Sequence, residues 1–286
     1  MSNTLTLSCE FFPPKTEKGF NNLRRVREAL APLSPAFYSV TFGAGGSTQD
    51  NTIEAVLDIQ EQYPVTGINA APHLSCVGSS ADRLREMLDT YRNHNIRHIV
   101  ALRGDLPSGM RDPGDFRYAS ELVEFIRKES GDYFTIEVAA YPEVHPQAQT
   151  AEIDLINFKR KVDAGADSAI TQYFYNIDAY RFFLDRCQKN GIDIPIVPGI
   201  MPINNFAQLA RFSASCGAEI PRWLRKRLEE FYDDTESMKA FTLDFLTDFT
   251  HQLIELGVPG LHFYTMNKTE PTLTICQRLN LITQKT

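Results

Sequence analysis

Glu10 is the side chain whose neighbours in the sequence most favour acid–base chemistry. It lies between apolar residues, Cys9 on one side and Phe11 and Phe12 on the other, and two prolines follow. We expect this setting to desolvate the carboxylate and raise its pKa, which would prepare it to act as a general acid. A carboxylate that caps a loop or pairs with an arginine fits the same position. From position alone, the two interpretations are about even.

A second carboxylate, Asp105, follows an apolar run in the segment RGDLP. Gly104 permits a ligand to approach the backbone closely, so Asp105 could orient a substrate or tune a cofactor. It could equally be a turn residue that pairs with Arg103. Other apolar runs also end on polar groups, such as Thr41, His73, Tyr141, Gln172 and Tyr264. A barrel with a purely structural role would not need them.

A line of polar residues is predicted along one helix, AEIDLINFKRKVDAG (151–165). Asp154, Asn157 and Lys161 are spaced by three and four, which places them on one line beside the apolar stripe. Such a line could bind a ribityl chain and phosphates, but the spacing alone favours a solvated helix face. Elsewhere, GAGGSTQD (43–50) matches no nucleotide-binding fingerprint, and His94 and His98 lack the context of a metal pair.

Eight predicted strands would bring these residues together. They cover 4–10, 36–42, 67–73, 98–104, 134–140, 168–174, 195–201 and 260–266, and amphipathic segments separate them. This alternation indicates parallel strands, and eight units favour closure into a barrel whose active site lies at the strand carboxyl ends. We therefore predict an α/β fold, a single (βα)8 TIM barrel over 1–286. The long segment 217–257 predicts two helices and hence an extra helix after the seventh strand.

Composition narrows the functional classes. The 286 residues carry a net charge of −7, so no basic field attracts nucleic acid. The sequence has no run of about 18 apolar residues and no secretory leader pattern, so we expect no membrane partner and a cytoplasmic location. Five cysteines without CxxC spacing predict free thiols and no structural disulfide.

An ordered set of segments resembles the bacterial methylenetetrahydrofolate reductases. The segments are CEFFPPK, SVTFGAGGS, NAAPHLSC, RHIVALRGDLP, VAAYPEVHP, NFKRKVDAGAD, ITQYFYN, PGIMPINNF and HFYTMNK. Each is weakly informative, but together and in order they are specific. The resemblance implies a barrel with tightly bound, non-covalent FAD, which relays hydride from NADH or NADPH to 5,10-methylenetetrahydrofolate in a ping-pong reaction. It also suggests a homo-oligomer.

The resemblance assigns roles to individual residues. It implies that Glu10 is the general acid and that Asp105 contacts the pterin and lies near the flavin. It implies that Gln172 contacts both substrates, that Thr41 and Gln208 contact the nicotinamide nucleotide, and that Phe212 packs near the folate, although Phe212 could equally be helix core. The implied flavin contacts are Phe42, Ala44, His73, Arg103, Gly104, Asp105, Tyr118, Ala119, Tyr141, His145, Ala148, Asp154, Asn157, Arg160 and Lys161.

Two positions depart from the family pattern. Tyrosine is frequent in the family where Phe42 stands, and arginine is frequent where Lys268 stands in the substrate site. Two other classes remain as alternatives: a lyase or aldolase on the same barrel, which would need a lysine at a strand end, and a barrel that binds a ligand without catalysis. The sequence leaves the choice between NADH and NADPH open.

Overall fold

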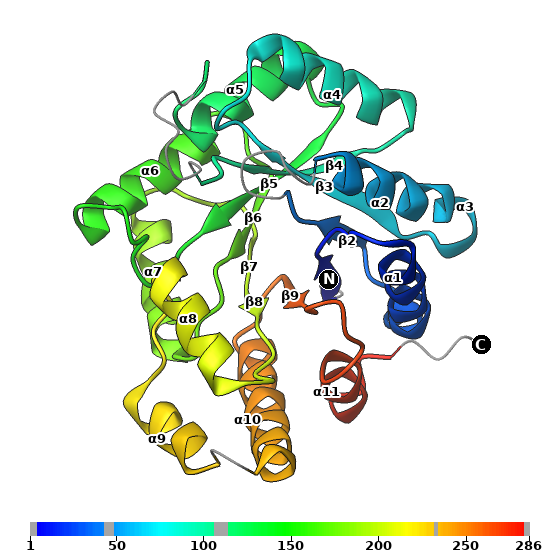
Figure 1. Cartoon of the computed structure of the whole chain (residues 1–286). Coiled ribbons are helices and arrows are strands. Elements are labelled where there is room, and N and C mark those ends of the chain that lie inside the picture. Colours follow the sequence, from blue (N-terminus) through cyan, green and yellow to red (C-terminus); the bar gives the residue numbers. More distant parts are fainter. Residues whose placement is uncertain (1–4, 43–48, 106–113, 232–233, 283–286) are drawn as a thin grey trace.

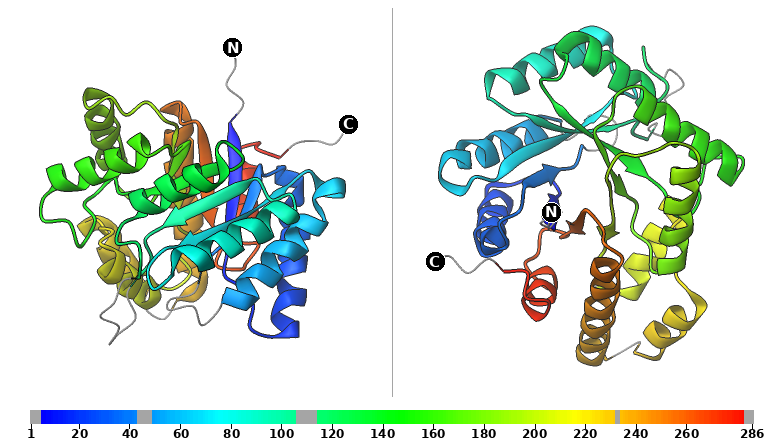
Figure 2. Two further views of the ribbon diagram at one scale, coloured as in Figure 1. Left: turned by 90° about the horizontal axis from the view of Figure 1, so that it is seen from above. Right: turned by 180° about the vertical axis from the view of Figure 1, so that it is seen from behind.

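A ring of parallel strands lies at the centre of the molecule, with helices around it (Figures 1 and 2). The structure, a computed structural model, describes residues 5–42, 49–105, 114–231 and 234–282. Its strands run in the order β7-β6-β5-β4-β3-β2-β1-β9-β8. They are β1 (Thr6–Phe11), β2 (Phe37–Val40), β3 (Asn69–Ser75), β4 (His98–Leu102), β5 (Thr135–Ala140), β6 (Ser168–Thr171), β7 (Ile196–Val197), β8 (Gly199–Ile200) and β9 (Gly260–Tyr264).

The predicted seventh strand is divided into β7 and β8 at Pro198. β7 pairs with β6, and β8 pairs with β9, so the chain itself joins the two ends of the strand order. Proline has no N–H to donate to a strand ladder, which explains the interruption. Its carbonyl still accepts a hydrogen bond from the backbone N–H of His262 at 3.0 Å. The predicted barrel is therefore confirmed, with its seventh strand in two parts.

Helices follow the strands along the chain. They are α1 (Glu17–Leu30), α2 (Gln49–Glu61), α3 (Tyr63–Thr66), α4 (Ala81–Asn93), α5 (Ala119–Ser130), α6 (Ala151–Asp163), α7 (Ile177–Lys189), α8 (Phe206–Cys216), α9 (Arg222–Glu230), α10 (Thr235–Glu255) and α11 (Thr272–Arg278), with a short 3-10 turn at η1 (Ala31–Leu33). Along the chain, α8, α9 and α10 all come after β8 and before β9 (Figure 1). The predicted extra helix is present, and 217–257 contains two helices as expected. In the part of the chain described, no helix is long and apolar enough to cross a membrane.

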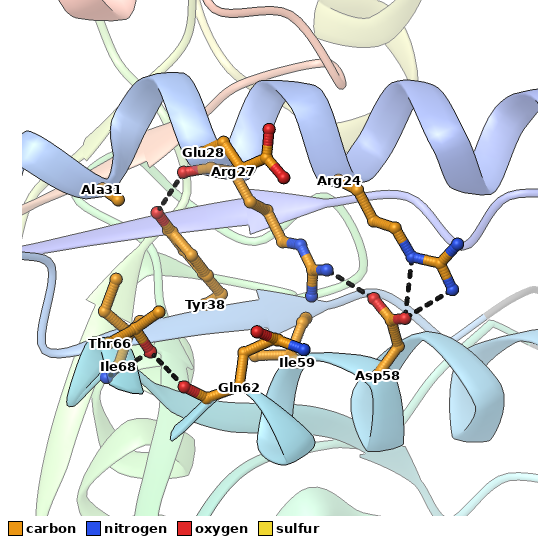
Figure 3. Close-up of a pocket in the computed structure, with 10 residues that line it drawn as sticks. All are labelled: Arg24, Arg27, Glu28, Ala31, Tyr38, Asp58, Ile59, Gln62, Thr66 and Ile68. Carbon is orange, nitrogen blue, oxygen red and sulfur yellow. Dashed lines mark hydrogen bonds and ion pairs between the residues drawn. The ribbon is translucent and has the colours of Figure 1, made fainter. Parts of the chain in front are cut away.

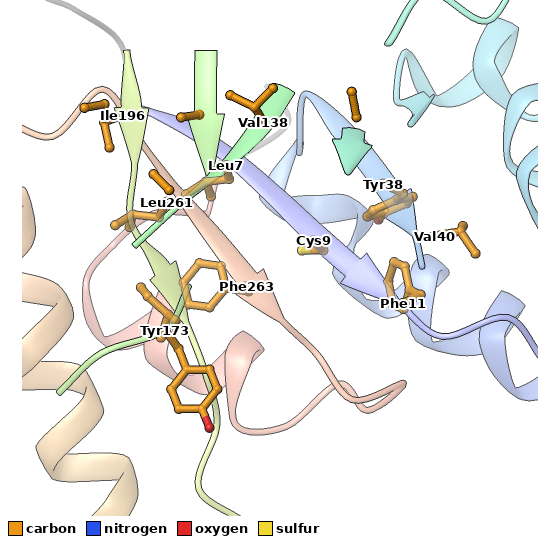
Figure 4. Close-up of a cluster of buried hydrophobic side chains, with 14 of the residues drawn as sticks. Leu7, Cys9, Phe11, Tyr38, Val40, Val138, Tyr173, Ile196, Leu261 and Phe263 are labelled. Atoms are coloured by element: carbon orange, nitrogen blue, oxygen red, sulfur yellow. The ribbon is translucent and has the colours of Figure 1, made fainter. Parts of the chain in front are cut away.

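Strand alternation separates the apolar and polar chemistry of the barrel. On β1, Leu7, Cys9 and Phe11 belong to the large core between the strands and the helices (Figure 4). The residues between them have the opposite orientation, because successive side chains of a strand point to opposite faces. Ser8 and Glu10 therefore face the barrel interior, where both contact His262. The sequence neighbours of Glu10 thus face away from it.

Apolar side chains also fill the middle of the barrel. Phe37, Ala71, Val100 and Ile170 form a buried cluster there. At the amino-terminal end of β4, the His98 Nε2 atom lies 2.9 Å from Glu137 Oε1 on β5, within hydrogen-bonding distance. These side chains fill the middle and the amino-terminal end of the barrel, so the cavity lies at the carboxyl ends of the strands.

Candidate active site

A cavity of about 440 Å³ opens at the carboxyl ends of the strands. The structure brings Glu10, Thr41, Asp105 and Gln172 together in its wall, although they come from four different strands or strand ends. His73, Tyr141, Phe212 and Tyr264 complete the polar and aromatic part of the lining. Among the described residues that line the cavity, there is no lysine, so the amine that a Schiff-base lyase would need is missing from this wall.

Glu10 lies between two histidines in this cavity. Its Oε2 atom is 3.1 Å from Nε2 of His73 on β3 and 3.6 Å from Nε2 of His262 on β9. The Nδ1 atom of His262 lies 2.7 Å from the Ser8 hydroxyl, two residues before Glu10 on β1. His262 is completely buried, and the Glu10 side chain is 14% exposed. One carboxylate oxygen therefore interacts with two imidazoles, and one of these imidazoles is fixed from behind by a hydroxyl.

The expectation that Glu10 has a raised pKa is wrong for this structure. Burial does raise the pKa of the carboxyl, but the charges and hydrogen bonds of His73 and His262 outweigh burial and lower the pKa to about 2. The sequence argument relied on Cys9 and Phe11, which face the opposite side of the strand. Glu10 is therefore a carboxylate at neutral pH, and any proton that it donates must first reach it from an adjacent group.

A second cavity, of about 380 Å³, adjoins the first, and Tyr141 lines both. It contains ten of the residues for which flavin contact was predicted: Arg103, Tyr118, Ala119, Tyr141, His145, Ala148, Asp154, Asn157, Arg160 and Lys161. Ser120 and Gln147 also line it and were not predicted. Both are sequence neighbours of predicted residues, which was the signal available for finding them. The cavity lies between β4, the beginning of α5, the end of β5 and the length of α6.

The polar line of α6 faces this cavity. The interpretation that its spacing alone favoured, a solvated helix face, is therefore wrong. Asp154 Oδ2 accepts a hydrogen bond from the backbone N–H of His145 at 3.0 Å, and Lys161 Nζ donates to the carbonyl of Ala139. Burial lowers the pKa of the Lys161 amine to about 8, although Asp154 acts in the opposite direction. A cation held in this way costs desolvation energy, which an anionic ligand would offset.

A third, smaller cavity of about 90 Å³ extends from the central one on its other side. Gln208, Lys268 and Asn205 line it, and Met201 and Phe212 are shared by the two cavities. Asn205 also begins α8, because its side chain accepts a hydrogen bond from the backbone N–H of Gln208 at 2.9 Å. Phe212 is 36% exposed and faces these cavities, so it is not a plain helix-core residue.

The loop after β4 holds Asp105 exposed at the rim. Arg103 Nε donates to the carbonyl of Gly104 at 3.1 Å, and within the described residues Arg103 and Asp105 form no ion pair. The alternative prediction, that Asp105 is a turn residue paired with Arg103, is therefore wrong. Gly104 has a φ of +83°, and a Cβ there would lie 1.9 Å from Ser75 Oγ. The glycine is required by Ser75 on the neighbouring strand, whatever ligand approaches it.

The remaining predicted residues have other positions. Phe42 is half-buried and packs against the core between the barrel and the helices, rather than lining any of the three cavities. Ala44 lies outside the described residues. His262 was missed from the sequence, although it alternates with Tyr264 on the last strand and the strand period would have placed both in the barrel.

A nearly closed parallel barrel, with a cavity at its strand carboxyl ends and a carboxylate held there by histidines, is the arrangement of a (βα)8-barrel enzyme. The chain belongs to the methylenetetrahydrofolate reductase family: the family model with that description matches residues 1–280. It is 44% identical to the 5,10-methylenetetrahydrofolate reductase of Escherichia coli (strain K12), over 97% of this chain and 91% of that one. It is 39% identical to methylenetetrahydrofolate reductase (NADH) 1 of Arabidopsis thaliana, over 96% of this chain and 48% of that one.

A solved structure with a similar fold comes from Clostridium thermocellum. It is described as an uncharacterized protein that binds two copies of 5-methyl-5,6,7,8-tetrahydrofolic acid. The TM-score is 0.67 at 17% identity, with 98% of this chain and 96% of that one covered. At this identity the likeness supports the barrel fold alone, whereas the sequence relatives establish the family and its reductase activity.

Proposed function

We propose that the chain reduces 5,10-methylenetetrahydrofolate to 5-methyltetrahydrofolate, with FAD as cofactor and NADH or NADPH as electron donor. The observation that carries this proposal is the junction of two cavities at Tyr141, one lined by Arg103, Arg160 and Lys161 and the other by Glu10, Asp105 and Gln172. When bound, FAD would supply the relay that carries hydride from the nicotinamide to the folate.

The second cavity has the donors and acceptors that FAD requires. Arg103, Arg160 and Lys161 can donate to the pyrophosphate oxygens, because within the described ranges none of them forms an ion pair with an acidic side chain. Asp154 and Asn157 can accept from ribityl hydroxyls. These residues therefore fit the cofactor that the family resemblance implies.

The central cavity would receive both substrates in turn. Gln172 and Thr41 lie in its wall together with Asp105, and the shared Phe212 leads to the small cavity of Gln208 and Lys268. Because the same wall would hold either substrate, the two would occupy this cavity alternately, as a ping-pong reaction requires. Lys268 can pair with a substrate carboxylate as a point charge, although it cannot form the bidentate pair of an arginine.

Glu10 would act as the general acid when the five-membered ring of the folate opens. Because the pKa of its carboxyl is about 2, Glu10 needs a neighbour that holds the proton. His73 and His262 are in position to do so, since their Nε2 atoms face Glu10 Oε2 at 3.1 Å and 3.6 Å. A proton that moves from either Nε2 to Oε2 would be carried to the edge of the cavity.

Spectroscopy of the purified protein tests the proposal. The protein should be yellow with flavin absorbance, NADH or NADPH should bleach that absorbance without oxygen, and methylenetetrahydrofolate should restore it. Protein that binds FAD and is bleached, but that folates never reoxidise, would refute folate reduction. Protein that binds folate without any flavin would support a barrel that binds its ligand without this chemistry.

A further inference from the structure

A separate cavity of about 200 Å³ lies between α1 and α2, away from the three cavities of the active site. Its wall combines the end of α1 and η1 with β2, the end of α2 and the segment before β3 (Figure 3). Ala31, Thr66 and Ile68 all precede the beginning of a strand, so the cavity lies toward the amino-terminal ends of the strands. The active site, with Glu10, is at the opposite ends.

Arg27 is the unusual residue of this cavity. It is only 7% exposed, yet among the described acidic side chains it pairs with one oxygen of Asp58 alone, which accepts from Nη2. Within the described residues, its buried Nε has no hydrogen-bond partner. A guanidinium offers five N–H groups, and buried polar groups in proteins are nearly always hydrogen-bonded. Arg27 therefore keeps donors that the protein does not use.

Asp58 does not accept from the remaining N–H groups of Arg27. Its Oδ1 already accepts from both Nε and Nη2 of Arg24, at 2.8 Å and 2.6 Å, while Oδ2 accepts from Arg27. The Tyr38 hydroxyl points to the backbone carbonyl of Arg27 and donates to it at 3.0 Å. Figure 3 shows the other terminal nitrogen of Arg27 directed over Ile59 and Gln62, into the space that these side chains enclose.

The remaining wall of the cavity is mostly apolar. Ala31, Tyr38, Ile59 and Ile68 form it, so a ligand would place an apolar body against these side chains. The volume of about 200 Å³ is below the range of about 300–1,000 Å³ of pockets for drug-sized ligands, which restricts the ligand to a small one. Guanidinium donors above an apolar wall match an oxygen acceptor on a compact hydrophobic body.

We propose that this cavity is a second ligand site, which binds a small carboxylate with a ring or branched apolar body through the free N–H groups of Arg27. Arg24 and Arg27 are balanced by Asp58 and by the exposed Glu28 at the rim, so no net positive field attracts anions in general. Selectivity would come from hydrogen bonds and shape. The site is independent of the proposed folate chemistry.

Binding of 4-fluorobenzoate to the flavin-loaded protein, followed by fluorine NMR, tests the proposal. We expect saturable binding that 5-methyltetrahydrofolate does not displace. 4-Fluorobenzyl alcohol, which has the same ring without the carboxylate, should bind at least tenfold more weakly. Ala31→Leu should weaken 4-fluorobenzoate binding at least tenfold, because it fills the cavity and leaves the guanidinium in place.

Two further variants separate recognition from folding. Arg27→Gln should also weaken binding, and Glu28→Gln should leave it intact or tighten it. Reductase activity should be unchanged in Ala31→Leu, which reports that the barrel is folded. The absence of saturable binding would overturn the proposal. Binding that persists in Ala31→Leu, or that 5-methyltetrahydrofolate displaces, would also overturn it, because the carboxylate would then occupy another site.

Discussion

At the residue scale, a single oxygen of Glu10 faces the imidazoles of both His73 and His262. The histidines come from β3 and β9, which lie on different sides of β1 in the ring. Because this environment is assembled across strands, residues adjacent to Glu10 in the sequence do not determine its protonation. Because these contacts lower the pKa of the Glu10 carboxyl to about 2, the proton donation that we propose needs a proton from a neighbouring group.

The lowered pKa of Glu10 predicts how stability changes in acid. Its pKa falls from 4.5 to about 2 in the folded chain, so the carboxylate stabilises the fold above pH 4.5, and this contribution is lost as the pH falls toward 2. The wild-type chain should therefore be more stable than Glu10→Gln above pH 4.5. This difference in the free energy of unfolding should shrink by about 1.4 kcal/mol for each unit by which the pH is lowered from 4.5 toward 2. Urea unfolding at several pH values measures it.

The control for this measurement is a carboxylate that forms an ion pair on the surface. Glu86 is 67% exposed and pairs with Arg83 on the same helix, so Glu86→Gln removes a carboxylate from water-screened surroundings. Its effect on the free energy of unfolding should vary much less with pH. A flat difference for Glu10→Gln would contradict the strong pairing with the two histidines.

Glu10 could be selected from the sequence as a candidate catalytic residue, but its pKa could not be predicted. Its position at a strand end and the EFFPP motif were readable, whereas the contact with His73, 63 positions further along, needed the strand register. Period-two alternation could have shown that Cys9 and Phe11 face away from Glu10. The same rule places His262 inside the barrel, which the search for local histidine spacing could not reveal.

At the element scale, α6 serves as one wall of the proposed flavin site. Leu155 and Phe158 bury one side of the helix, and Asp154, Asn157 and Lys161 line the second cavity. The spacing of three and four could be read from the sequence, but the spacing does not say whether a polar line meets water or a cavity. That choice depends on the loop after β5, whose His145 backbone binds Asp154.

Two lysines of α6 give a matched test of this element. Lys161→Met should weaken FAD binding by about tenfold or more, because one charge-assisted hydrogen bond to phosphate is worth about 1.5–3 kcal/mol. Lys159→Met should leave FAD binding unchanged, since Lys159 pairs with Asp163 on the surface. Fluorescence titration of the stripped protein with FAD measures both. Equal losses in the two variants would indicate a nonspecific charge effect and contradict the assigned site.

At the scale of the whole molecule, the barrel could be predicted because eight strand segments alternate with helices throughout the chain. The division of the seventh strand at Pro198 was also readable in principle, since proline interrupts a ladder. The packing of α8, α9 and α10 could not be derived in the same way, because the contacts between these helices depend on tertiary structure. Assembly into a homo-oligomer and the cytoplasmic location remain predictions.

The predicted single domain over 1–286 should unfold cooperatively. The only tryptophan, Trp223 on α9, packs edge-on against Phe245 of α10, so its fluorescence reports on the packing of these two helices. Its transition should coincide with the loss of helical circular dichroism in urea. Two separated transitions would show that 217–257 unfolds as an independent unit.

The most direct test of the central claim is anaerobic stopped-flow analysis of Glu10→Gln in its two half-reactions. The variant should retain FAD, because Glu10 is not among the residues that line the second cavity. NADH or NADPH should reduce its flavin at the wild-type rate, because hydride transfer from the nicotinamide needs no proton from Glu10. Reoxidation by methylenetetrahydrofolate should slow by about 10²–10⁴-fold, the usual contribution of a general acid. Reoxidation at the wild-type rate would contradict the account.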